Sequence, residues 1–107
     1  MSAHLEPAWL VHAVDQRLAA IEQALAEMPN LAGVNVMMTT LTEPDEGANE
    51  LAIKRWERSC DRCNRYCPPH LDFYTGSLTR ELAKYPGIQV IVTFGVCGRC
   101  HARFPLG

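Results

Sequence analysis

Two pairs of cysteines have the spacing of a metal site. Two residues lie between Cys60 and Cys63 and two between Cys97 and Cys100, and 33 residues separate the pairs. A tight turn at each pair places two sulfur atoms on one side of the backbone, and two such turns facing each other supply four thiolates to a tetrahedral ion. We therefore expect these four cysteines to bind a structural Zn²⁺.

Cys67 and His70 complete a second candidate ligand set. Together with Cys60 and Cys63 they form the pattern C-x2-C-x3-C-x2-H, which contains enough ligands for a local site. This set would leave the second CxxC pair without a purpose, so we favour the set built from both pairs and keep Cys67 and His70 as alternative ligands. Cys67 is then a thiol near the metal, and a thiol or zinc redox sensor is one alternative function.

No constellation of residues in the sequence indicates an enzyme. A site closed by four thiolates has no open coordination position, so it cannot activate water. The sequence contains no Gly-rich phosphate loop, no nucleophile elbow and no HExxH motif. Thioredoxin-type chemistry needs CxxC at the start of a long helix with strands beyond it, and only seven residues follow Cys100. We expect a protein without enzymatic activity.

Basic and aromatic side chains crowd around the two cysteine turns. Cations interleaved with aromatic rings beside a zinc turn are typical of modules that hold nucleic acid, so a nucleic-acid-binding zinc-ribbon protein is an alternative function. Four thiolates and Zn²⁺ together carry about −2, however, and the arginines could equally balance that charge. The candidate binding face consists of Arg55, Trp56, Arg58, Arg62, Arg65, Tyr66 and Arg99.

Charge divides unequally along the chain. The net charge is −2, but residues 1–53 hold one cation and eight acids, whereas residues 54–107 hold nine cations and four acids. A nucleic-acid-binding domain is usually more uniformly basic. We therefore favour a non-enzymatic zinc-binding interaction module that binds a protein partner, with nucleic acid as the alternative ligand.

The elements that must position the cysteines begin with a helix. Apolar side chains recur at alternating spacings of three and four residues, which predicts one amphipathic helix over residues 7–28 that ends before Pro29. We expect this helix to pack on a sheet of its own chain, although the same seam would also suit a homodimer through helix 7–28. The seam consists of Val11, Val14, Leu18, Ile21, Leu25 and Met28.

Runs of β-branched residues predict strands in the remainder of the chain. Residues 33–41 and 88–94 are the clearest strands, and residues 51–58 could add another, so we assign strands to 33–59 and a two-knuckle zinc region to 60–100. For residues 77–85 we expect a short helix, with a hairpin turning at Pro86-Gly87 as the alternative. The fold class is α+β: a single domain over 1–107, with a long N-terminal helix packed on a sheet of about three strands and a zinc-ribbon-like four-cysteine site.

The sequence indicates a cytoplasmic protein. No apolar run approaches the length of a membrane helix, so we expect no membrane association. Residues 1–6 lack the basic start and apolar stretch of a secretory signal.

Three segments resemble small CxxC proteins of actinobacteria and actinobacteriophages. They read RWERSCDRC at 55–63, FYTG at 73–76 and TFGVC at 93–97, so the resemblance covers about half the chain and leaves out the N-terminal helix. The resemblance implies a zinc-ribbon-like module in the cytoplasm, or in the host cytoplasm if a phage encodes it. A phage protein that acts on a host factor would fit this setting, but no shared function of these proteins is established.

Overall fold

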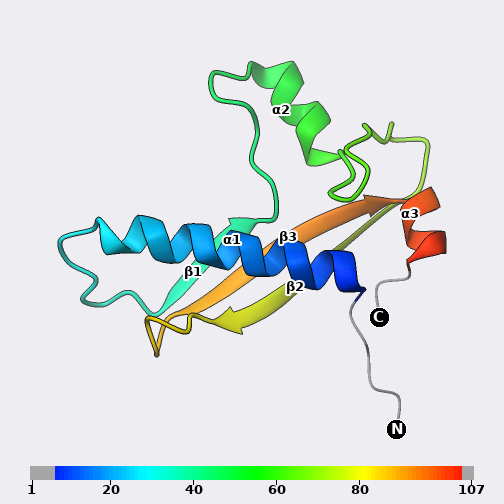
Figure 1. The fold of residues 1–107 in the computed structure, drawn as a ribbon. Helices are drawn as coiled ribbons and strands as arrows, with labels where there is room; N and C mark the ends of the chain where they lie inside the picture. Colours follow the sequence, from blue (N-terminus) through cyan, green and yellow to red (C-terminus); the bar gives the residue numbers. More distant parts are fainter. Residues whose placement is uncertain (1–6, 105–107) are drawn as a thin grey trace, which may run out of the picture.

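The computed structural model describes residues 7–104 and confirms the α+β class. The expectation of no secretory signal rests on residues 1–6, which lie outside the described residues. Figure 1 shows the elements, which follow in the order α1 (Ala8–Ala26), β1 (Val36–Thr40), α2 (Glu50–Glu57), β2 (Phe73–Glu81), β3 (Gln89–Cys97) and α3 (Gly98–Arg103).

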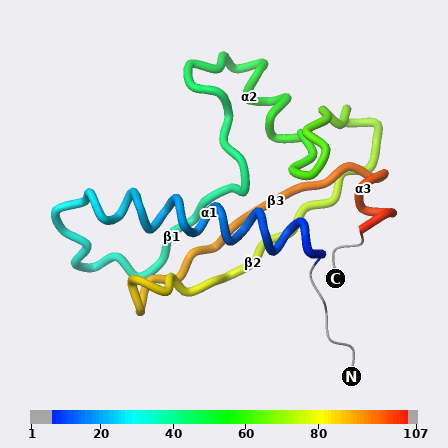
Figure 2. Tube along the Cα trace, in the orientation of Figure 1, coloured from blue at the N-terminus to red at the C-terminus, as the bar shows by residue number. Residues whose placement is uncertain are grey.

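The three strands form one mixed sheet in the order β1-β3-β2. β3 is the central strand, as its apolar sequence predicts: it runs parallel to β1, with Met38 opposite Ile91, and antiparallel to β2, with Gly76 opposite Phe94. α1 lies across one face of this sheet (Figures 1 and 2). β3 also leads directly into α3, so the second cysteine pair begins where the central strand ends.

The predicted seam of α1 packs against the sheet of its own chain. Of the seam residues, Val14, Ile21 and Leu25 are buried in one cluster that includes Val92 of β3, because successive turns of an amphipathic helix place these side chains on the same face. Leu10, which the predicted seam does not include, is buried in the same cluster, whereas Val11 is not. Two seam residues are not buried by this packing, since Val11 is 40% exposed and Met28 is 50% exposed. A homodimer through this helix stays a prediction.

The strand expected within residues 51–58 is wrong, because Glu50–Glu57 form the helix α2. The side chain of Asn49 accepts a hydrogen bond from the backbone N–H of Ala52 at 2.8 Å and so caps the helix, and Glu50 pairs with Lys54 one turn later. Of the strands assigned to 33–59, the structure contains only β1. The first cysteine pair therefore follows a helix and not a strand.

The helix expected at 77–85 is also wrong, and the alternative hairpin is correct. β2 pairs along its full length with β3, from Phe73 opposite Cys97 to Glu81 opposite Gln89. The chain turns between them through Gly87, whose φ of 96° suits glycine. A central strand needs partners on both edges, and this pairing outweighs the weak helical propensity of the segment.

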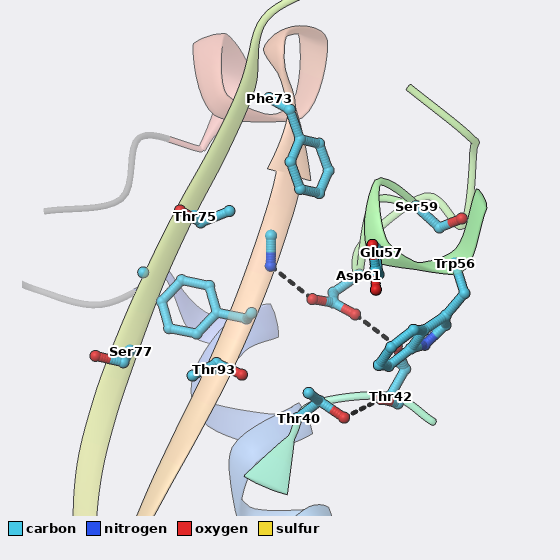
Figure 3. Close-up of a pocket in the computed structure, with 13 residues that line it drawn as sticks. Thr40, Thr42, Trp56, Glu57, Ser59, Asp61, Phe73, Thr75, Ser77 and Thr93 are labelled. Atoms are coloured by element: carbon cyan, nitrogen blue, oxygen red, sulfur yellow. Dashed lines mark hydrogen bonds between the residues drawn. The ribbon is translucent and has the colours of Figure 1, made fainter. Parts of the chain in front are cut away.

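The face of the sheet opposite α1 is open. Side chains alternate along a strand, so Met38 points away from α1, and 76% of its surface is exposed. α2 stands off from the strands, with no buried residue of its own (Figure 2). Between the open face and the segment from α2 to the first cysteine turn lies a cleft, which Figure 3 shows.

Candidate metal centre

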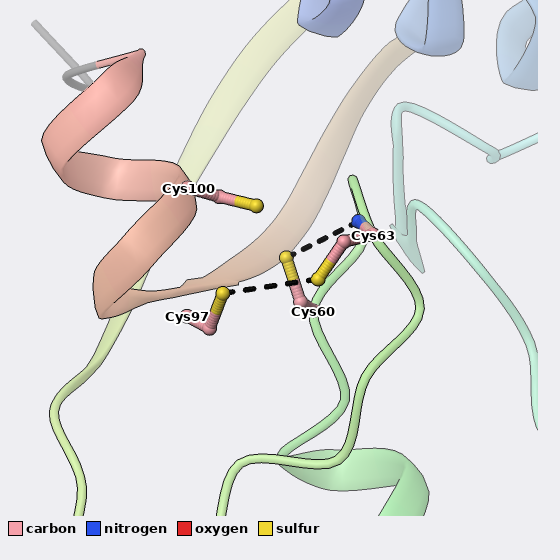
Figure 4. Close-up of side chains that lie close together, drawn as sticks. All are labelled: Cys60, Cys63, Cys97 and Cys100. Carbon is pink, nitrogen blue, oxygen red and sulfur yellow. Dashed lines mark hydrogen bonds between the residues drawn. The ribbon is translucent and has the colours of Figure 1, made fainter.

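The four cysteines of the two CxxC pairs come together at one end of the sheet. The sulfur atoms of Cys60, Cys63, Cys97 and Cys100 all lie within 4.8 Å of one another, and those of Cys63 and Cys97 are 3.8 Å apart (Figure 4). Zn–S bonds of about 2.3 Å in a tetrahedron place the sulfur atoms roughly 3.8 Å apart. The cluster could therefore hold a metal ion with little rearrangement.

The first cysteine turn is built by backbone hydrogen bonds. The N–H of Cys60 donates to the carbonyl of Arg65, and the N–H of Asn64 donates to the carbonyl of Cys60, both at 2.8 Å. Asn64 has a φ of 63°, a left-handed conformation that asparagine tolerates better than most residues. The N–H of Cys63 points at the sulfur of Cys60, 3.4 Å away, which stabilises a thiolate there.

Asp61 attaches this turn to the central strand. Its N–H donates to the carbonyl of Gly95 at 2.8 Å, and its carboxylate accepts from the N–H of Gly95 at 2.7 Å. The other carboxylate oxygen accepts from the hydroxyl of Thr42 at 2.7 Å. Since Gly95 lies two residues before Cys97, this clamp connects the two cysteine pairs independently of any ion. The sequence did not predict these hydrogen bonds, because the turn sequence CDRC contains no signal for a partner on a distant strand.

The second pair spans the junction of β3 and α3. Cys97 is the last residue of the strand and Cys100 lies in the first turn of the helix. The N–H of Gly98 donates to the carbonyl of Asp72 at 3.2 Å, which connects this turn to the start of β2. Trp9 of α1 packs against both the cysteine cluster and the main core, so the N-terminal helix is coupled to the metal centre.

Burial and hydrogen bonding act differently on the thiols. Burial raises the pKa of Cys100 to about 12, and it also raises the pKa of Cys63. Burial opposes ionisation of Cys60 too, but backbone N–H groups, including that of Cys63, outweigh it and lower its pKa to about 7. Four thiolates are costly to gather at one buried place, and a bound divalent cation offsets that cost by favouring the ionised forms.

The alternative ligands Cys67 and His70 do not join the cluster among the described residues. Cys67 is buried, and its thiol donates to the carbonyl of Asp72 at 3.2 Å. The side chain of His70 is exposed. The structure thus brings together the favoured set and separates the C-x2-C-x3-C-x2-H set.

The candidate binding face is divided by the fold. Arg55 lies over the ring of Tyr66 at 4.8 Å, and Trp56 lines the cleft on the open face of the sheet. Arg62 lies over the ring of Phe104 at 4.0 Å, with one guanidinium nitrogen 3.7 Å from the sulfur of Cys100. Arg65 and Arg99 are exposed beside the metal centre.

Arg58 has a structural role that its place in the candidate binding face did not suggest. Its guanidinium donates to the carbonyls of Cys67, Pro68 and Leu71, at distances from 2.8 to 3.3 Å, and lies over the ring of Phe73 at 5.2 Å. The guanidinium donates from Nε and a terminal nitrogen together and so reaches carbonyls that lie apart, whereas the ammonium of a lysine donates from a single atom. Arg58 therefore holds the loop between the first cysteine turn and β2.

We expect Arg58→Lys to destabilise the protein by about 2 kcal/mol, because the ammonium cannot replace the hydrogen bonds of the guanidinium. Thermal unfolding followed by circular dichroism measures this loss. Arg65→Lys is the matched control, since Arg65 is exposed and its side chain makes no hydrogen bond within residues 7–104, and its effect should stay within about 0.5 kcal/mol. Equal stabilities of the two variants would contradict the assignment.

Comparison with known proteins finds no matching family model, no matching curated protein and no matching solved structure. The resemblance to small actinobacterial and phage CxxC proteins therefore stays a prediction. Within residues 7–104, none of the helices combines the length and the hydropathy needed to cross a membrane.

Proposed function

We propose that this chain is a small, non-enzymatic zinc-binding module whose metal centre stabilises a surface that binds a protein partner. The observation that carries the proposal is the convergence of four sulfur atoms from two turns far apart in the sequence. Four cysteine ligands at tetrahedral spacing favour zinc over magnesium or calcium, which prefer oxygen ligands. A site of four protein thiolates leaves no position for a substrate, so the metal serves the structure.

The metal stabilises a part of the fold that has little core of its own. The cluster around it contains few buried residues: Cys60, Val96 and Cys100, with Trp9 packed against them. A chain of this size gains from a cross-link between distant segments, because its hydrophobic core supplies a small stability. Zinc would connect the segment after α2 to the end of the central strand.

Exposed apolar side chains support a protein partner. Val36 and Met38 of β1 are 55% and 76% exposed on the open face of the sheet, and Leu51 of α2 is 67% exposed. α2 buries no residue against the rest of the chain. Exposed apolar side chains that gather on one face are typical of interaction surfaces, and Val36 and Met38 lie two residues apart on the same face of β1.

The proposed function predicts that the zinc-loaded chain, immobilised, retains one protein at stoichiometric level from lysate of the source cell. Cys97→Ser should abolish this retention, because the surface depends on the metal centre. Mass spectrometry of the eluate, with Cys67→Ser as the matched control, measures the result. A chain that binds one zinc ion and retains no protein would overturn the partner assignment while leaving the metal assignment intact.

Nucleic acid remains a second candidate ligand because of four exposed arginines. Arg62, Arg65, Arg99 and Arg103 surround Cys63 and Cys100 in a hollow of about 200 Å³. Their charge exceeds the roughly −2 of a zinc tetrathiolate, so a positive surface would remain. Binding of a labelled single-stranded oligonucleotide should then weaken steeply with salt and on Arg99→Ala, but not on Lys84→Ala. Affinity that is independent of salt would exclude this candidate.

A further inference from the structure

A cleft of about 510 Å³ lies on the face of the sheet that α1 leaves open. The strands form one wall of the cleft, and α2 with the first cysteine turn forms the other (Figure 3). The strand wall carries the hydroxyls of Thr75, Ser77 and Thr93. The metal centre lies outside the cleft, since no cysteine lines it.

Three aromatic residues line the cleft, one of which is Phe94 of β3. Trp56 comes from α2, and Phe73 comes from the start of β2 (Figure 3). The ring of Phe73 lies so close to Gly95 that a Cβ atom there would be 2.4 Å from it. Phe73 therefore packs directly against the strand, and the cleft offers apolar surface beside its polar groups.

The charge in the cleft is negative. Glu57 and Asp61 are the charged residues that line it, and neither lysine nor arginine does. The nearby guanidinium of Arg58 lies over the ring of Phe73 but donates to three backbone carbonyls.

The two carboxylates differ in the number of hydrogen bonds that they accept. Asp61 accepts hydrogen bonds from Gly95 and Thr42, which keep it in place. Glu57 is exposed, and within residues 7–104 its carboxylate takes part in no hydrogen bond or ion pair. Glu57 is thus the group with free capacity to accept a donor from a ligand.

We propose that this cleft binds a lysine or arginine side chain from a basic segment of the protein partner. The aliphatic stem of such a side chain packs against Trp56 and Phe73, and its cationic head reaches Glu57 and the strand hydroxyls. A phosphate backbone would meet two carboxylates without a compensating cation, and a neutral sugar would leave the carboxylate charge unbalanced. The inference rests on the proposed function, since it names the chemistry of that partner.

The test is the binding of a short fluorescein-labelled peptide of alternating lysine and alanine to the zinc-loaded protein, followed by fluorescence anisotropy. We expect Glu57→Gln to weaken binding about fivefold, the effect of a partly exposed ion pair. Glu27→Gln is the matched control, because it removes the same charge from an exposed residue just after α1, and it should change affinity less than twofold. A peptide with glutamate in place of lysine should not bind. Circular dichroism and zinc content verify that each variant is folded.

The contrary outcomes separate this inference from the proposed function. If Glu57→Gln and Glu27→Gln weakened the affinity for the lysine peptide equally, the peptide would be attracted by the overall negative charge, and the cleft assignment would be overturned. Binding of maltotriose or of the glutamate peptide in place of the lysine peptide would overturn it as well. If the immobilised wild type and Glu57→Gln retain the same natural partner equally, the cleft inference fails and the proposed function stands. If neither retains a partner, the proposed function itself fails.

Discussion

Cys97→Ser should release the metal and leave most of the chain unfolded at room temperature. The substitution removes one of four sulfur atoms that lie within 4.8 Å of one another, at the end of the central strand. Structural zinc contributes about 10 kcal/mol or more to folding in small zinc modules, whereas a domain of this size has a net stability of roughly 5–15 kcal/mol. Native mass spectrometry should show one zinc ion in the wild type and none in the variant, and circular dichroism should show the lost structure. Adding a chelator to the wild type should have the same effect.

Cys67→Ser is the matched control for this prediction. It makes the same chemical change in another buried cysteine, whose thiol donates to the carbonyl of Asp72 and does not join the cluster. A serine hydroxyl can donate to the same carbonyl, so zinc content should stay at one ion per chain. Zinc retained in Cys97→Ser, or lost in Cys67→Ser, would contradict the ligand set.

The parts of the fold that were predicted correctly depend on short-range patterns. A CxxC turn needs only four consecutive residues, and the pairing of two such turns follows from the preference of zinc for four ligands. The seam of α1 is equally local, since residues three and four apart share a helix face. β3 is recognisable because its run of apolar, β-branched residues is typical of a strand whose alternate side chains are buried, here Val90, Val92, Phe94 and Val96.

The errors lie where partners distant in sequence decide the local structure. Residues 77–81 contain good helix formers, but the unpaired edge of β3 binds them as a strand. Residues 50–57 contain the apolar residues Leu51 and Ile53, which favoured a strand, yet the fold leaves both exposed on α2. Burial in a sheet therefore did not determine the secondary structure of residues 50–57. The hydrogen bond from Ala52 to the Asn49 side chain favours a helix there.

The candidate site shows the same limit. The four cysteines could be assigned from their spacing, but the separate roles of the arginines could not. Arg58 and Arg65 are indistinguishable in a list of basic residues, whereas the structure gives one three carbonyl partners and leaves the other exposed. The cleft also combines residues from β1, α2, the first cysteine turn, β2 and β3, a combination that no local pattern contains.

Gly95→Ala tests the contact on which both the metal centre and the cleft depend. The carbonyl of Gly95 accepts from the N–H of Asp61, and the N–H of Gly95 donates to the carboxylate of Asp61. The ring of Phe73 covers the place where a Cβ atom of residue 95 would lie. A Cβ atom would lie 2.4 Å from the ring, so the ring or the strand must move. We expect a destabilisation of about 3 kcal/mol, near the upper end for overpacking, and a fall in melting temperature of roughly 10–20 °C.

Two further variants make this prediction specific. Gly98→Ala adds the same methyl group three residues along, where the nearest atom is 3.7 Å away, and should change stability by less than about 1 kcal/mol. Phe73→Leu in the Gly95→Ala background removes the ring that the new methyl group meets, so the double variant should lose less stability than the two single losses combined. Strictly additive losses would mean that the cost of Gly95→Ala lies in the clamp to Asp61, and the ring would then not be what requires glycine at this position.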